Sequence, residues 1–423
     1  MKKIALVATD VALPDERGLP RLHYLAEMLC RYGYYVDLIT SNFQHWTKEF
    51  RTEESIRESR RLSQCHIAIV TQPGYKKNVE LQRVISYRIY AKHVKEYLEN
   101  NDYDLVYCLI PDNHIAAVSA KYAKERNIPF IVDVEDLWPE AMKMIFNVPI
   151  ISDILFSNYT INAITTYKLS DGLVGSSNTY CNEPLKYNIN VPNRVTVYVG
   201  NDIDDFDRGA KENLSKVNKP EGEFWISYAG TLGTSYDIAT LIQAADILAK
   251  KGLTNIKIMI MGDGPLRQNF EDLAHKLSGN VEFLGYLSHD LMAAYLVKSD
   301  VTINSFVKKA PQSFVSKIGD YLAAGKPMIN TCVDPEFWKK VENEGFGINV
   351  EPENPVALAR VIVQFKNYKN MCLDMGRIAR DVAEREFNKA YTYLKIVDLV
   401  DSLVGDKREL YEKCMDEVAT NAI

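Results

Sequence analysis

A lysine and a carboxylate stand three residues apart in QSFVSKIGDYLAAGKP, the stretch from Gln312 to Pro327 that reads as a helix followed by a short strand. Residues at this spacing share one face of a helix, so Lys317 and Asp320 form either a surface ion pair or two contacts to one ligand. A lysine ammonium suits phosphate oxygens, and a carboxylate accepts hydrogen bonds from ribose hydroxyls. Spacing alone favours the surface ion pair.

Two glycine-rich turns each join a predicted strand to a predicted helix. One is Gly230-Thr231-Leu232-Gly233, and the other surrounds Gly262. Glycines at such a junction let backbone amides approach an anion, and the dipole of the following helix supports the anion. Either turn alone is explained equally well as a structural turn. Two in one domain favour a nucleotide-diphosphate ligand.

Composition places the chain among soluble globular proteins. Its 423 residues are 47% hydrophobic and 25% charged, and two domains of about 200 residues are the natural division. The net charge of -6 gives no reason to expect nucleic acid as a partner. The seven cysteines form no CxxC motif, the start MKKIALVATD predicts a strand instead of a signal peptide, and no apolar run reaches membrane-spanning length. We therefore expect a cytoplasmic protein.

Short apolar strands alternate with helical patterns through both halves of the chain. In the first half the predicted strands are 4–8, 36–40, 67–70, 105–110, 130–134 and 173–175; in the second they are 225–229, 256–261, 281–284, 301–304, 328–330 and 347–350. This alternation predicts parallel sheets covered by helices on both faces. The polar segment 201–223 marks the boundary, which gives an acceptor-binding domain at 1–203, a donor-binding domain at 204–386 and C-terminal helices at 387–423. Ligands of two such domains are expected at the carboxyl ends of the strands, in the cleft between them.

From Trp225 to about Asn367 the sequence resembles the donor domain of the family-4 retaining glycosyltransferases of the GT-B fold. The resemblance rests on YAGTLGTSYDIATLIQAADIL, IMIMGDGPLR, VEFLGYLSHDLMAAYLVKSDVTINSF and SKIGDYLAAGKPMIN, in that order. RLHYLAEMLCRYGYYVDLITSNFQHW and IPFIVDVEDLWPEAM are similar to the bacterial branch that includes the N-acetyl-L-fucosamine transferase of O-antigen assembly. The resemblance implies an α/β protein with two Rossmann-like doubly wound domains facing a cleft, and C-terminal helices crossing back to the first domain.

The resemblance also assigns roles on the donor side. Lys317 would face the leaving diphosphate and Asp320 the ribose, while Gln312 replaces the glutamate that touches the transferred sugar. An Arg and a Lys that many members use on the diphosphate fall near Thr231 and Tyr236, so Lys317 is the remaining cation. The expected donor-binding residues are Gly18, Gly230, Thr231, Gly233, Gly262, Tyr286, Leu287, Gln312, Ser316, Lys317 and Asp320.

On the acceptor side, many members carry a histidine where this chain has Glu135-Asp136. Asp136 matches the branch, whereas Glu135 replaces a basic residue. A carboxylate at a strand end can orient or deprotonate an acceptor hydroxyl, and Asp136 can equally cap a helix. The expected catalytic residues are Asp136, Glu135 and Lys317. His114 also follows a strand, and for it a structural role at a helix start is favoured over one in the cleft.

Two Asp-x-Asp sequences, 102–104 and 202–204, mimic the metal motif of the other major transferase fold, but one leads into a strand and the other lies in the predicted linker. We expect no required metal and no cofactor. Residues 48–95 hold eleven Lys or Arg against five Glu, and AMKMIFNVPIISDILF is strongly apolar. Docking on the inner face of an anionic membrane would explain both features. The alternative is that the basic residues form a solvated helix and the apolar stretch forms an ordinary buried helix.

The sequence thus predicts a retaining glycosyltransferase that uses a nucleotide-sugar donor, most simply a UDP-sugar. Its acceptor would be a glycan or a polyprenyl-diphosphate-linked glycan in O-antigen, lipopolysaccharide or capsule biosynthesis. Two alternatives stay open: a UDP-sugar 2-epimerase of the same fold, and a non-catalytic nucleotide-sugar-binding subunit, which is motivated by Gln312 and the missing Arg and Lys.

Overall fold

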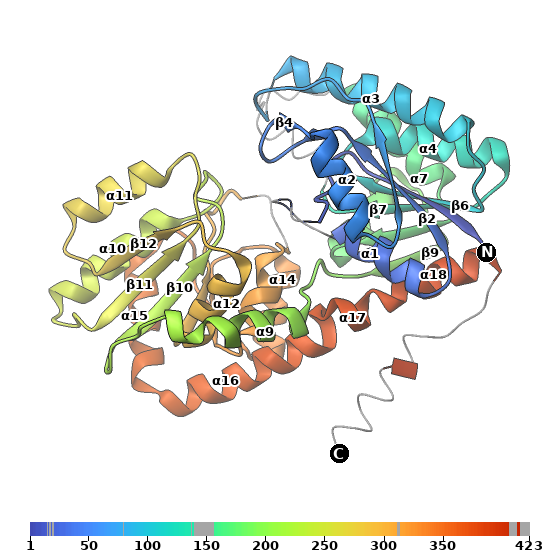
Figure 1. The fold of residues 1–423 in the computed structure, drawn as a ribbon. Coiled ribbons are helices and arrows are strands. Elements are labelled where there is room, and N and C mark those ends of the chain that lie inside the picture. Colours follow the sequence, from blue (N-terminus) through green and yellow to red (C-terminus); the bar gives the residue numbers. More distant parts are fainter. Residues whose placement is uncertain are drawn as a thin grey trace. The chain divides into compact units, whose positions relative to one another are not determined.

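The computed structural model describes residues 1–414 except 15, 17, 19–20, 79, 137, 139–155, 311–313 and 406–412. The chain divides into two compact units. The first unit is Met1–Val197 with Tyr393–Ile423, and the second unit is Tyr198–Thr392. Both are α/β units built on a parallel sheet (Figure 1).

The first unit contains a seven-stranded parallel sheet in the order β5-β2-β1-β6-β7-β8-β9. The strands are β1 (Lys3–Val7), β2 (Tyr35–Ser41), β5 (His66–Val70), β6 (Leu105–Ile110), β7 (Phe130–Val134), β8 (Gly172–Gly175) and β9 (Asn193–Thr196). A two-stranded ribbon, β3 (Phe43–Gln44) and β4 (Glu49–Phe50), follows β2. The order reverses between β1 and β6, which makes their carboxyl ends the switch point where such sheets bind ligands.

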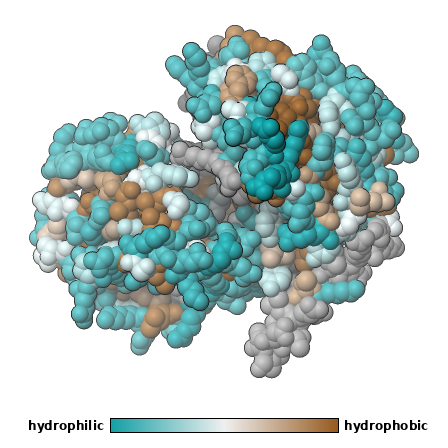
Figure 2. Space-filling model, viewed as in Figure 1, coloured by the Kyte–Doolittle hydropathy of each residue, from teal (hydrophilic) through white to brown (hydrophobic). Residues whose placement is uncertain are grey.

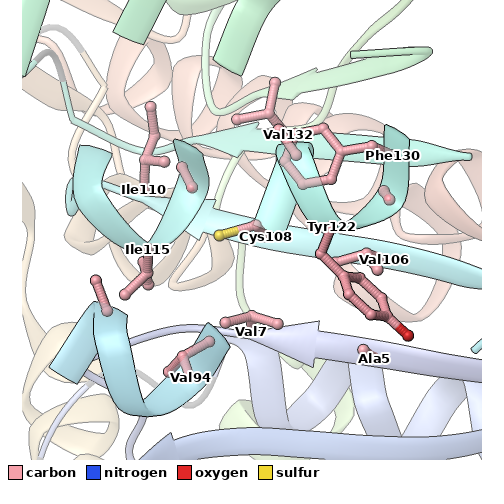
Figure 3. Packing of buried hydrophobic residues seen from close by; sticks show 14 of the residues in the cluster. Ala5, Val7, Val94, Val106, Cys108, Ile110, Ile115, Tyr122, Phe130 and Val132 are labelled. Atoms are coloured by element: carbon pink, nitrogen blue, oxygen red, sulfur yellow. The ribbon is translucent and has the colours of Figure 1, made fainter. Parts of the chain in front are cut away.

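Helices cover both faces of this sheet because its central strands are apolar on both sides. They are α1 (Arg21–Arg31), α2 (Glu53–Leu62), α3 (Leu81–Glu99), α4 (Asn113–Arg126), α7 (Ser157–Leu169), α8 (Asn178–Cys181) and α18 (Leu394–Val404). On one face, Val94 of α3 and Ile115 of α4 pack against Val7, Cys108 and Val132 of the strands (Figure 3). On the other, α18 joins the core through Ile396, Val397 and Val400 (Figure 1). The C-terminal segment therefore returns to the first unit, as the sequence predicts.

The second unit contains a six-stranded parallel sheet in the order β12-β11-β10-β13-β14-β15. Its strands are β10 (Phe224–Ala229), β11 (Ile256–Met261), β12 (Val281–Gly285), β13 (Val301–Asn304), β14 (Met328–Asn330) and β15 (Gly347–Asn349). Its helices are α9 (Ile203–Asn213), α10 (Ile238–Lys250), α11 (Arg267–Lys276), α12 (His289–Lys298), α13 (Lys317–Ala323), α14 (Pro335–Glu344), α15 (Pro355–Asn367), α16 (Lys369–Val382) and α17 (Lys389–Thr392). In chain order the strands run 3-2-1-4-5-6, the Rossmann arrangement, and the switch point lies between β10 and β13.

The polar segment 201–223, expected to be a linker, contains helix α9. Ile203, Phe206 and Ala210 are buried in the second unit's core, and their spacing of three and four residues is that of one helix face. Charged residues on the opposite face give the segment its polar composition. Strand β9 is absent from the sequence prediction because it is a polar strand at the edge of the sheet, and its first two residues are exposed.

A buried ion network fixes α1 against the first sheet. Arg21 is 2% exposed and contacts both oxygens of Asp133, at 3.1 Å each, while its Nε lies 2.8 Å from Glu135 Oε1. Tyr107 donates a 2.6 Å hydrogen bond to Asp133, and Arg21 donates to the hydroxyl of Tyr393. Burial opposes the charge of Arg21, but Asp133 and the other acidic partners raise its pKa well above the usual range.

We predict that Arg21→Met destabilises the protein by about 3–5 kcal/mol, because it leaves buried Asp133 without its counter-charge. Denaturant unfolding followed by circular dichroism measures the effect. Arg61→Met is the matched control: Arg61 pairs with Glu58 on the surface, where both side chains are about half exposed or more, and no measurable change is expected. Equal stability of the two variants would contradict the prediction.

The visible face of both units is mostly hydrophilic, and hydrophobic residues form separate patches on it (Figure 2). Within the described residues, no helix is both long and apolar enough to cross a membrane. Most of the apolar stretch 141–156 lies outside the described residues.

Candidate functional site

Lys317 carries a buried cation at the switch point of the second sheet. Its ammonium lies 4.3 Å from the ring centroid of Tyr228, 4.1 Å from that of Tyr236 and 5.1 Å from that of Phe306. Tyr228 belongs to β10, Tyr236 to the turn after β10 and Phe306 to the segment after β13. The residue is 9% exposed, and among the described residues its Nζ has no hydrogen-bond partner.

This environment disfavours the charged form of the lysine. Burial lowers the pKa of the Lys317 ammonium well below its usual value. Aromatic faces attract a cation, but they supply neither a hydrogen-bond acceptor nor a full negative charge. An anion that reaches Nζ therefore gains both an ionic contact and a hydrogen bond in surroundings of low dielectric.

The two predicted glycine turns pack against each other beside this cation. A Cβ on Gly262 would lie 1.9 Å from the carbonyl oxygen of Gly230, and a Cβ on Gly264 would lie 2.4 Å from that of Leu232. The turns are joined by the hydrogen bonds from Gly230 N to Met261 O and from Leu232 N to Asp263 O, both 2.9 Å. The close packing of the two turns thus explains why residue 262 is a glycine. A Cβ on Gly233 would instead have Thr231 Cγ2 as its neighbour, at 3.6 Å.

Asp320 lies on the same short helix as Lys317 but has a different partner. His289 Nε2 lies 2.9 Å from Asp320 Oδ1, so the two residues three apart do not form the surface ion pair that their spacing allows. Burial alone would lower the pKa of His289, but the hydrogen bond to Asp320 and the charges of Asp320 and Asp205 raise it. The Asp320 side chain is 18% exposed, which leaves part of its carboxylate accessible.

The other donor-side predictions fall at several places. Tyr286 (59% exposed) and Leu287 follow β12, Ser316 immediately precedes α13, and Thr231 is exposed. Gly18 belongs to the first unit, where a Cβ would lie 2.7 Å from the Trp46 ring. Gln312 lies outside the described residues.

On the acceptor side, the two predicted carboxylates differ in their surroundings. Glu135 is ion-paired with buried Arg21, which makes it part of the network that holds the fold. Asp136 accepts a 3.2 Å hydrogen bond from the indole of Trp138, and the residues that would show whether it caps a helix, 139–155, lie outside the described range. His114 is 8% exposed near the start of α4 and packs edge-on against Tyr159, in keeping with the structural role favoured for it.

Both Asp-x-Asp sequences have structural partners. Asp104 pairs with Lys2 and Asp102 with Arg126, while Asp202 caps α9 by accepting from Asp205 N. In the described part of the chain, two groups bring three ligand-type atoms within 4.8 Å of one another: His23, Glu27 and Cys65, and Asp205, His289 and Asp290.

Sequence reasoning missed two features of these sites. The aromatic residues around Lys317 come from three separate segments, so no local pattern shows them, although Tyr236 stands where the family resemblance expects a cation. Asp10 was also missed. It follows β1 at the switch point of the first sheet, and its position at the end of the first strand was an available signal.

Comparison with known proteins finds a family likeness within the second unit. Residues 210–382 match the family described as glycosyl transferases group 1. EpsD of Bacillus subtilis, which is named as a glycosyltransferase, is 26% identical over 184 residues, covering 42% of this chain and 45% of EpsD. The match thus spans less than half the length of that relative.

Solved structures extend the likeness to nearly the whole chain. Sucrose-phosphate synthase from Thermosynechococcus elongatus superimposes with a TM-score of 0.71 at 17% identity, over 96% of this chain and all of that one. Anabaena HepE in complex with UDP superimposes with a TM-score of 0.68 at 15% identity, over 95% of this chain and all of that one. Identities this low show the fold alone, and they confirm the predicted GT-B fold of two Rossmann-like α/β domains.

We predict that Gly262→Ala destabilises the protein by about 2 kcal/mol or more, since the new methyl group meets the Gly230 carbonyl and the backbone φ of 138° is strained for any other residue. Thermal unfolding measures the loss. Gly233→Ala, in the facing turn, is the control and is expected to unfold near the wild-type temperature. A similar loss in both variants would show that contact with the facing turn is not the cause.

Lys317→Met should stabilise the ligand-free protein at neutral pH by about 1–2 kcal/mol, because an apolar chain of similar length replaces a buried ammonium that has no acceptor within the described part of the chain. Since the folded pKa is lowered, the penalty is fully present below it and disappears as the pH rises through the usual value of 10.5. Denaturant unfolding at pH 7 and pH 10 measures the difference. A destabilised variant at pH 7 would mean that the ammonium supports the fold.

Proposed function

We propose that this protein is a glycosyltransferase that moves a sugar from a nucleoside-diphosphate sugar to a hydroxyl group of a glycan or lipid-linked acceptor. The observation that carries the proposal is the buried ammonium of Lys317, which has no hydrogen-bond partner among the residues that the structure describes and lies at the switch point of a sheet in Rossmann order. The match of residues 210–382 to group 1 glycosyltransferases supports the reaction type, and the UDP bound by HepE supports UDP as the nucleotide.

In this proposal the second unit holds the donor. Lys317 binds the diphosphate, whose negative charges supply the counter-ion that the aromatic rings do not, and the amides of the Gly230–Gly233 turn face the same phosphates. Asp320, oriented by His289, accepts hydrogen bonds from the ribose. Tyr286 and Leu287 pack against the base, while Gln312, expected from the resemblance to contact the transferred sugar, lies outside the described residues.

Lys317 then contributes to the chemistry as well as to binding. When the bond between the anomeric carbon and the diphosphate oxygen breaks, its electron pair stays on that oxygen, and negative charge increases there. An ammonium in surroundings of low dielectric stabilises this charge more strongly than it stabilises the ground state. The first unit binds the acceptor, with Asp136 positioned to orient its hydroxyl. We further propose that the reaction retains configuration at the anomeric carbon and that the donor is a UDP-sugar. The enzyme would act in O-antigen, lipopolysaccharide or capsule assembly.

The first experiment measures UDP binding by calorimetry in two buffers with different ionisation enthalpies. Burial lowers the pKa of Lys317 and the charge of a bound diphosphate raises it again, so UDP binding should be coupled to proton uptake, which appears as a difference in heat between the buffers. Lys317→Met should lose the proton uptake and bind UDP about 10- to 100-fold more weakly, the worth of a charge-assisted hydrogen bond.

The matched control is Lys276→Met, on the exposed end of α11, which should bind UDP like the wild type. Unchanged UDP affinity in Lys317→Met would overturn the assignment of Lys317. Product analysis with UDP-sugars then tests the activity. Transfer to an acceptor supports the transferase, epimerised donor formed without acceptor identifies an epimerase, and tight binding with neither product identifies a non-catalytic subunit.

A further inference from the structure

Asp10 occupies the switch point of the first sheet, the position that Lys317 occupies in the second. It follows β1, and its neighbour Thr9 donates a 3.2 Å hydrogen bond to Asp112, which follows β6. The backbone before Asp10 is pinned by the hydrogen bond from Tyr90 to Ala8 O, at 3.0 Å. Its carboxylate is 18% exposed, so it is accessible from solvent.

Ionisable groups face Asp10 from each element that packs against it. Tyr87 of α3 donates a 3.0 Å hydrogen bond to Asp10 Oδ2, and His45 Nδ1 lies 3.6 Å from the same oxygen. Arg83 of α3 and Lys48 near β4 contribute positive charge, and Asp112 contributes negative charge. Burial and the two cations lower the pKa of His45 to about 3, so its imidazole is neutral at physiological pH.

The balance of these effects disfavours a charged carboxylate. Burial is the largest effect and raises the pKa of Asp10 to about 6; Arg83, Tyr87 and Lys48 oppose this rise, and the charge of Asp112 adds to it. A carboxylate kept for structural reasons is normally paired with a cation, as Asp133 is with Arg21. The charged form of Asp10 is instead disfavoured, which is typical of residues kept for function.

An aromatic cluster connects Asp10 to the acceptor-side motif found in the sequence. The Tyr87 ring stacks on Trp138, with centroids 6.0 Å apart and planes 20° apart, and Trp138 donates to Asp136. The Arg83 guanidinium lies 4.8 Å from the Trp138 ring and also donates to the Tyr87 hydroxyl. Asp10 and Asp136 are thus two carboxylates on one continuous set of contacts within the first unit.

We propose that Asp10 is the acceptor-side base: its carboxylate binds the reacting hydroxyl of a sugar-type acceptor and takes its proton. This inference rests on the proposed function and adds the residue that activates the acceptor. As the acceptor oxygen forms its bond to the anomeric carbon, on the face that the diphosphate leaves so that configuration is retained, its proton passes to Asp10, which becomes a neutral carboxylic acid. The anomeric carbon loses its bond to the diphosphate oxygen, which keeps the electron pair. Asp136 and Trp138 would position the acceptor beside Asp10.

The test compares Asp10→Asn with Asp102→Asn, a carboxylate of the same unit that is 93% exposed. UDP-glucose and UDP-N-acetylglucosamine serve as donors, water and octyl β-glucoside as acceptors, and the rate of UDP release is the readout. General-base catalysis predicts that Asp10→Asn lowers this rate about 100-fold and that Asp10→Glu restores part of it. UDP affinity should stay within about twofold of wild type, because the proposed UDP contacts lie in the other unit.

Two further readouts separate catalysis from a structural role. In the wild type the rate should rise with pH through about 6, as Asp10 loses its proton, and this rise should be absent in Asp10→Asn. Because the folded pKa of Asp10 is raised, its ionised form costs stability above about pH 6. Asp10→Asn should therefore melt at a higher temperature than wild type at pH 7.5, and near the wild-type temperature at pH 4.

Several results would overturn the inference. An Asp10→Asn variant with the wild-type rate and pH profile would assign the proton to another group, such as the departing phosphate. A variant that melts lower than wild type at pH 7.5 would assign Asp10 to the fold. A wild-type chain that binds UDP but releases none from either donor would remove the role of Asp10 and leave the donor site standing. Failure of the wild type to bind UDP would instead overturn the proposed function.

Discussion

The Lys317 ammonium lies among three aromatic rings and, in the described part of the chain, has no hydrogen-bond acceptor; the proposed donor site depends on this interaction. Removing a cation from water is costly, and rings return only part of that cost. The surrounding fold imposes this arrangement. Helix α13 begins at Lys317, and the three aromatic residues Tyr228, Tyr236 and Phe306 lie in or after strands β10 and β13, which pair with each other. The two glycine turns beside it pack so closely that no Cβ fits at Gly262.

The first unit contains two kinds of buried charge: charged residues whose pairing stabilises the fold, and a charged residue whose ionised form is disfavoured by its surroundings. Arg21, Asp133 and Glu135 are paired and hydrogen-bonded, and the pairing raises the pKa of the arginine, so the charged state is the favoured one. Asp10, after the carboxyl end of β1, is 18% exposed, close to the 17% of Glu135, yet its charged state is disfavoured. The same distinction separates Lys317 from the many surface lysines. In both units the disfavoured charge lies at the switch point, where parallel sheets of this type bind their ligands.

Much of the fold could be predicted from the sequence because continuous apolar runs report central parallel strands directly. β6, β7, β11, β13 and β14 have the predicted bounds. β9 could not be predicted, because an edge strand exposes polar residues, and α9 was mistaken for a linker, because its polar face dominates the composition. The sequence could predict that Lys317 and Asp320 lie on one helix. It could not predict that the two side chains would have different partners. Glu135, predicted as a catalytic residue, became a partner of Arg21, which lies 114 positions earlier in the chain.

The sequence by itself determined the alternation of strands and helices, the place of the glycine turns and the lysine–acid pair, because each depends on residues within a few positions of one another. Only the tertiary structure decided which ionisable groups are paired and which are not. That outcome depends on which distant segments meet in the folded chain. Around Lys317 these are β10, the turn after it and the segment after β13; around Asp10 they are β1, α3 and the β3–β4 ribbon. Burial and pairing set the free energy of a charge, and both are properties of the packed chain.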